Sequence, residues 1–131
     1  MIAISRKIYD AIILHAQKDA PIEACGYLGG KDGAVSLHYP MTNVDNSEEH
    51  FSFDPKEQFA AFKETSAQKL RLIACYHSHP ATPARPSKED IRLAYDPNIS
   101  YIIVSLANGA IDLKSFRIKN GEATNEEVIV I

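Results

Sequence analysis

Residues 75–90, CYHSHPATPARPSKED, constrain the fold of this chain more than any other part of its sequence. His77 and His79 are two positions apart, so in an extended strand their side chains point to the same face, with Cα atoms about 6.6 Å apart. Three prolines stiffen the loop that follows, and Ser87 stands where a new helical turn can begin. Asp90 then occupies the third helical position, where its carboxylate can turn back toward the helix N-terminus. We therefore expect a strand end and a helix start to meet at this point.

This spacing predicts a metal site. Two imidazoles and one carboxylate, with the fourth position left to water, are the pattern of a catalytic zinc ion rather than a structural one. We expect His77, His79 and Asp90 to be the ligands. A closed site that also recruits Cys75 is one alternative, but Cys75 lies about 13 Å along the strand from His79, too far to share one ion. A polar strand end without a metal is the other alternative, and Ser87 could act only as a helix cap.

Hydrolysis of a peptide bond at such a zinc ion also requires a base for the attacking water. Glu89 is adjacent to Asp90 and would point about 100° away from it on a helix. Glu48 and Glu49 lie in a polar segment, whereas Glu23, in PIEACGYLGG, precedes a strand and has small neighbours that allow another segment to approach. From the residues alone, Glu23 is one candidate among several.

Composition and charge limit the class of protein. The 131 residues suffice for one domain, 1–131, that folds without a disulfide or a structural metal. A formal net charge of −3 makes nucleic acid an unsuitable partner. The N-terminal segment has only a short apolar run flanked by charge, which fits neither a signal peptide nor a membrane span. With two cysteines and no C-x-x-C pair, we expect a cytoplasmic protein that contacts no membrane.

The pattern of apolar residues predicts an α/β fold. Ser5 can cap a first helix that ends before Pro21. Pro55 can open a second helix, whose apolar positions include Phe59, Phe62 and Leu70. Strands are expected at 25–30, 34–41, 71–77, 102–106, 111–118 and 127–131. The order of these elements predicts helices packed on a curved, largely antiparallel mixed sheet.

The two cysteines and the three other histidines are expected to have structural roles or to lie on the surface. We expect Cys25 and Cys75 to be small buried core residues on neighbouring strands. A redox-sensitive pairing between them is the alternative. His15, His38 and His50 are expected to be structural or surface residues, and His50 is the one expected nearest a substrate path.

The combination of Glu23, the HSHP segment at 77–80, Ser87 and Asp90 resembles the JAMM motif of the MPN-domain metalloproteases, a glutamate followed by H-x-H-x7-S-x2-D. The resemblance covers essentially the whole chain, and every motif position is present. It implies that the two histidines and Asp90 bind Zn²⁺, that Glu23 is the general acid/base, and that Ser87 helps to steady a tetrahedral oxyanion. It also implies a curved sheet between helices, related to the cytidine-deaminase architecture.

The resemblance further implies a substrate class. The compact chain leaves little room for the insertions of eukaryotic deubiquitinases and resembles the small prokaryotic branch of the family. The run HSHPATPARPSKEDIRLAYDPNISYIIVSL is similar to members that act on ubiquitin-like sulfur-carrier proteins, including members that release cysteine from a carrier's C-terminal glycine. We therefore expect a zinc metalloprotease that hydrolyses the bond after a Gly-Gly tail, with the extended tail added to a sheet edge.

Two other classes remain as alternatives. A catalytically silent MPN-type scaffold would bind partners only, but such modules commonly lose the metal ligands, and none is missing here. A nucleobase deaminase requires H-x-E and P-C-x-x-C arrangements, and this chain has neither.

Overall fold

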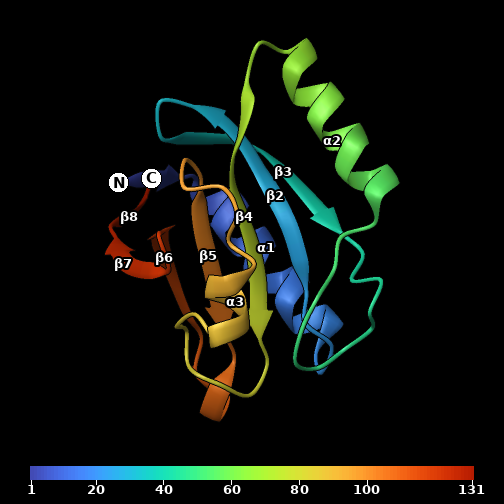
Figure 1. Cartoon of the computed structure of the whole chain (residues 1–131), viewed down its shortest axis with the longest axis vertical. Coiled ribbons are helices and arrows are strands. Elements are labelled where there is room, and N and C mark those ends of the chain that lie inside the picture. Colours follow the sequence, from blue (N-terminus) through green and yellow to red (C-terminus); the bar gives the residue numbers. More distant parts are fainter.

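One sheet of eight strands organises the computed structural model, which describes all residues from Met1 to Ile131. The elements, in chain order, are β1 (Ile2–Ile4), α1 (Arg6–Asp19), β2 (Cys25–Lys31), β3 (Ala34–Met41), α2 (Pro55–Ala67), β4 (Arg71–His79), α3 (Lys88–Arg92), β5 (Ser100–Ser105), η1 (Ala107–Gly109), β6 (Asp112–Lys119), β7 (Glu122–Glu126) and β8 (Val128–Val130). The strands are ordered β7-β6-β5-β4-β2-β3-β1-β8, with β4 and β2 in the middle (Figure 1). No helix is long and apolar enough to cross a membrane.

The sheet is mixed and strongly curved. The β2–β3, β2–β4, β5–β6 and β6–β7 pairs are antiparallel, whereas the β4–β5, β1–β3 and β1–β8 pairs are parallel. The two outer strands, β7 and β8, are separated in sequence by Glu127 alone, so the sheet must curl until its edges almost meet. The predicted α/β fold with a curved, largely antiparallel sheet is confirmed.

Helix α1 covers one face of the sheet. Ser5 caps the helix as predicted, because its hydroxyl accepts a hydrogen bond from the Ile8 N–H at 3.2 Å. Ile12 and Ala16 are buried against the sheet in the largest apolar cluster of the protein. The ring of Tyr76, from β4, is also buried in this layer. The main core therefore lies between α1 and the sheet.

Helices α2 and α3 lie on the opposite face, where Figure 1 shows α3 in front of the sheet and α1 behind it. Pro55 opens α2 as predicted. The apolar pattern does not identify the buried face of this helix, because Ala61 and Thr65 are buried while Phe59 and Phe62 are 61% and 58% exposed. Small residues face the sheet because α2 packs closely on Gly29 of β2.

Strand β2 shows how close this packing is. A Cβ atom added to Gly29 would lie 2.5 Å from the Thr65 methyl group of α2, and one added to Gly26 would lie 2.4 Å from the Tyr76 ring on the other face. Glycine therefore lets both layers approach the same strand.

Several strands differ from the sequence-based expectation, most of them by one or two residues at an end. Strands β1 and β7 were not predicted, and β4 extends to His79 rather than ending at position 77. β1 is only three residues long, and β7 has the polar sequence EATNE, so neither carries the apolar alternation that identifies a strand.

Candidate metal centre

His77, His79 and Asp90 come together at the C-terminal end of β4. The Nε2 atoms of the two histidines lie 3.1 Å apart, and each lies 3.2 Å from Oδ2 of Asp90. Both histidines are buried, at 6% exposure each. The three side chains thus present a compact triangle of one oxygen and two nitrogen atoms.

The dimensions of this triangle suit a tetrahedral metal ion. Ligand atoms about 2.0–2.1 Å from a zinc ion lie about 3.3–3.4 Å from one another at the corners of a tetrahedron. The observed separations of 3.1–3.2 Å match three such corners. The group can therefore hold a metal and leave a fourth position for water or substrate.

Local structure orients each of the three side chains. Nδ1 of His79 lies 2.9 Å from the carbonyl oxygen of Pro83, so the ring donates its proton there and keeps Nε2 free to act as a ligand. This carbonyl belongs to the proline-rich loop. The ring of His77 stacks on Phe51, with centroids 4.7 Å apart and planes at 25°.

Asp90 is oriented by the start of α3. As the sequence predicts, Ser87 is the N-cap and Asp90 the third helical residue, and the two form a capping box. The Asp90 carboxylate accepts a hydrogen bond from the Ser87 N–H at 2.9 Å. Burial would raise the pKa of Asp90, but the adjacent His77 and His79 rings outweigh it and hold this pKa well below its usual range. The carboxylate is therefore ionised, as a metal ligand must be.

Glu23 lies beside this triangle. The Ser78 N–H donates to the Ala24 carbonyl at 2.9 Å, and Cys25 pairs with His77, so the same antiparallel register brings Glu23 opposite His79. Glu23 is 4% exposed, and its Oε1 atom is buried without a hydrogen-bond partner. Burial raises the pKa of Glu23 to about 8, and the nearby Asp90 adds to this effect, although His79 opposes it. A carboxylate with such a pKa can accept and return a proton near neutral pH.

Three residues that support the site were missed by sequence reasoning. Asn43 is buried and donates to the carbonyl oxygens of Glu23, at 3.1 Å, and His50, at 3.0 Å, which ties the segment after β3 to the site. The Ser78 hydroxyl accepts a hydrogen bond from the Ala24 N–H at 2.7 Å and so fixes the backbone next to Glu23. Phe51 is the third. Only Ser78, which alternates with the two histidines, has a position in the sequence that could have indicated its role.

The other sequence candidates are not members of the triangle. Glu89 is exposed and pairs with Arg92, and Glu48 and Glu49 are exposed. His50 is also exposed and pairs with Asp45 at 3.1 Å.

The two cysteines do not take part in the metal group. Cys75 is not one of its members. Cys25 and Cys75 are free and buried on adjacent strands, and burial raises the pKa of each thiol to about 12. They are therefore unreactive core thiols in this structure.

A groove leads away from the metal centre. It has a volume of about 910 Å³, begins at His77 and Asp90, and runs across the sheet face between α2 and the segment that follows α3. Its walls carry several exposed aromatic and aliphatic side chains: Phe59, Phe62, Leu93 and Tyr95. An extended polypeptide could lie in it with one end at the triangle.

A curled mixed sheet with two histidines and an aspartate at the end of a central strand defines a protein of the JAB/MPN class. The model of the family described as prokaryotic homologues of the JAB domain matches residues 5–119, and the chain belongs to this family.

Two named relatives are similar to this chain in sequence. The chain is 35% identical to the CysO-cysteine peptidase of Mycobacterium tuberculosis, over 100% of this chain and 92% of that protein. It is 34% identical to the desampylase of Pyrococcus furiosus, over 63% of this chain and 59% of the relative.

Solved structures share the fold. The solution structure of protein DSY2949 from Desulfitobacterium hafniense has a TM-score of 0.90 and 46% identity, and the match covers 100% of this chain and 93% of that one. A structure described as JAMM, a metalloprotease-like zinc site in the proteasome and signalosome, has a TM-score of 0.64 and 23% identity, and covers 100% and 98% of the two chains.

Proposed function

We propose that this protein is a zinc-dependent peptidase that hydrolyses the bond after the C-terminal glycine of a ubiquitin-like sulfur-carrier protein. The observation that carries the proposal is the buried triangle of His77, His79 and Asp90 with the unpartnered Glu23 carboxylate beside it. The names of the relatives, a CysO-cysteine peptidase and a desampylase, support a carrier conjugate as the substrate. The zinc site of the JAMM structure supports zinc as the metal.

Each residue of the site has its own role in the reaction. When bound by the triangle, a zinc ion supplies a Lewis acid that activates water and polarises the scissile carbonyl. Glu23 accepts the proton that the attacking water loses and delivers it to the amine that leaves, so the carboxylate ends in its starting state. Ser87 can donate its hydroxyl proton to the oxyanion that develops on the former carbonyl oxygen.

The groove suits the tail of a carrier better than a side chain of a folded protein. An extended tail advances about 3.3 Å per residue, and its last two glycines would pass the buried end of the groove without a side chain to exclude. The leaving amine can come from a free cysteine or from a lysine of a tagged protein, and both belong to the proposed substrate class.

Glu23→Gln tests this function. The amide keeps the size of the side chain but cannot accept the proton, so we expect the variant to bind one zinc ion per chain and to lose at least ~10²-fold of the activity. Glu49→Gln, at an exposed carboxylate nearby, is the matched control and should keep the activity of the unmodified protein.

The substrates are a carrier with a C-terminal cysteine and a carrier joined to lysine, and mass spectrometry identifies the products. Near-full turnover by Glu23→Gln would contradict the role of Glu23. Failure of the zinc-loaded protein to cut either conjugate would contradict the proposed function and favour a scaffold that only binds partners. Failure to take up zinc would contradict both the proposed function and the role of Glu23.

A further inference from the structure

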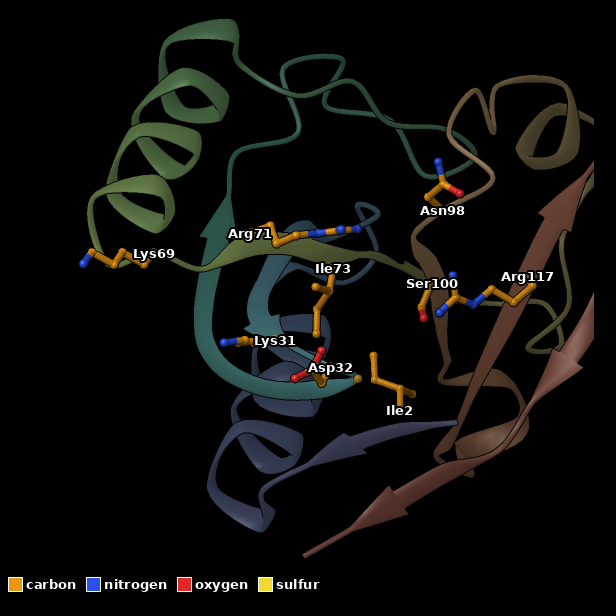
Figure 2. Close-up of a pocket in the computed structure, with 10 residues that line it drawn as sticks. Ile2, Lys31, Asp32, Lys69, Arg71, Ile73, Asn98, Ser100 and Arg117 are labelled. Atoms are coloured by element: carbon orange, nitrogen blue, oxygen red, sulfur yellow. The ribbon is translucent and has the colours of Figure 1, made fainter.

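A second hollow lies at the opposite end of β4 from the metal centre. It has a volume of about 360 Å³ and is lined by four cationic residues, Lys31, Lys69, Arg71 and Arg117, and by a single acidic residue, Asp32. Figure 2 shows that Arg71 and Arg117 extend toward the hollow from two sides, whereas Lys31 and Lys69 point outward from its rim.

Most of these cations have no acidic partner. Only Arg117 forms an ion pair, with Glu126 at 2.9 Å, while Lys31, Lys69 and Arg71 form none. This excess of positive charge occurs in a chain with a formal net charge of −3. Like charges gathered without partners repel one another and do not stabilise the fold, so an acidic ligand is the simplest reason for their grouping.

The hollow adjoins the groove that leads to the metal centre. Arg71 lines both, and the neighbours Asn98 and Ile99 line the hollow and the groove, respectively. Arg71 and His77 are six positions apart in β4, which corresponds to about 20 Å along a strand. A tail of about six extended residues spans this distance. A folded domain at the far end of such a tail would therefore stand over the hollow.

We propose that this cationic hollow binds acidic side chains on the folded body of the protein substrate. The inference rests on the proposed function and adds a second point of recognition to it. A protein surface fits the geometry better than one small anion does, because Lys31 and Lys69 diverge at the rim instead of pointing to a common centre (Figure 2). Such a contact guides the association of the two proteins and selects carriers with an acidic surface at the right distance from the tail.

Charge reversal at Lys31 and Lys69, which line the hollow but not the groove, tests this inference. Both side chains are exposed, so Lys31→Glu/Lys69→Glu should fold normally, which its thermal midpoint checks. Against a folded carrier with a C-terminal cysteine, we expect KM to rise by roughly 10-fold at low ionic strength and the effect to shrink in high salt. The matched control is Lys7→Glu/Lys18→Glu, which makes the same change in net charge on exposed positions of α1 and should leave KM unaltered.

The outcomes separate this inference from the proposed function. A second substrate, a peptide of the last eight carrier residues plus the cysteine, lacks the folded body, and the loss should be several-fold smaller on it. An equal loss on both substrates, or no loss on the folded carrier, would overturn the docking role while leaving the peptidase intact. If the unmodified protein cuts neither substrate, the proposed function fails. In that case the affinity of the carrier for the two double variants still tests the docking role. Binding of inorganic phosphate at Arg71, with carrier affinity unchanged in the variant, would also overturn the inference.

Discussion

The hydroxyl of Ser87 accepts a hydrogen bond from the Asp90 N–H at 3.0 Å, which leaves its own proton free to be donated. The backbone N–H of the same residue donates to the Asp90 carboxylate. One residue can therefore cap α3, orient a metal ligand through its backbone and stabilise an oxyanion through its side chain. Removal of the hydroxyl affects only the first and the last of these roles.

Ser87→Ala should lower kcat by about 10²-fold in zinc-saturated protein, because a lost oxyanion donor acts on the transition state. The lost cap should lower the free energy of unfolding by about 1 kcal/mol. Ser87→Thr keeps the hydroxyl and is the control. Steady-state kinetics together with urea unfolding distinguish the two effects, and a stability loss with unchanged kcat would reduce Ser87 to a helix cap.

Glu23 is a catalytic candidate because of its place in the fold. Its sequence neighbourhood predicts only that another segment can approach. The antiparallel pairing of β2 with β4 then brings it next to His79, 56 residues away in the chain. Burial without a hydrogen-bond partner distinguishes it from the exposed Glu48 and Glu49, and burial is a property of the folded chain.

At the scale of secondary-structure elements, α2 has two different faces. Ala61 and Thr65 pack on the sheet, whereas Phe59 and Phe62 project into the wall of the groove. A pair of exposed aromatic side chains in the wall of this groove contributes little to the core but can contribute apolar contact area to a bound partner.

Phe59→Ser/Phe62→Ser tests this division of α2. Because both rings are mostly exposed, we expect the free energy of unfolding to change by no more than about 1 kcal/mol. The KM for a carrier conjugate should rise by roughly 10-fold, since the groove loses two of its apolar contacts. Leu14→Ser, at a 65% exposed position of α1, is the control. Large destabilisation with unaltered KM would show that the two rings serve the fold instead.

Strand β7 illustrates why some elements escape recognition in the sequence. Its polar residues carry no alternation, yet β6 and β7 are joined by Asn120 and Gly121, whose φ angles of 53° and 77° form a tight hairpin turn. An Asn-Gly pair of this kind is a recognised hairpin signal. The turn residues therefore held the information that the apolar pattern lacked.

At the scale of the whole molecule, a buried polar network links α1 to the sheet. The Tyr76 hydroxyl lies 2.6 Å from Nδ1 of His15 and 2.8 Å from Nε2 of His38. Burial lowers the pKa of His38 to about 4, and the proximity of His15 adds to the shift. Burial also lowers the pKa of His15, although Asp19 opposes the shift. The folded protein therefore keeps both rings neutral at pH values where the unfolded chain would protonate them.

This network predicts a pH dependence of stability. His38 binds a proton near pH 6.5 in the unfolded chain but only near pH 4 in the folded protein. Its contribution to stability is therefore complete above pH 6.5 and is lost as the pH falls from 6.5 to 4. Between pH 7.5 and 5 the contribution should fall by on the order of 1 kcal/mol, a value that allows for solvent screening of a half-buried ring.

Urea unfolding at these two pH values measures the effect. The difference should be smaller in His38→Gln, whose amide can still bond Tyr76 but does not titrate. His50→Gln, at an exposed histidine, is the control and should keep the pH dependence of the unmodified protein. Equal dependence in all three proteins would show that His38 does not contribute.

The features of this protein that depend on local geometry can be predicted from its residues alone. The side chains of His77 and His79 share a face because strand residues alternate, and Asp90 turns back because a capped helix positions its third residue. Which acid stands beside the triangle, which face of α2 is buried and which three segments bring four cations to one hollow became visible only in the folded protein. These features depend on strand register and on the packing of distant segments, and a local pattern of residues specifies neither.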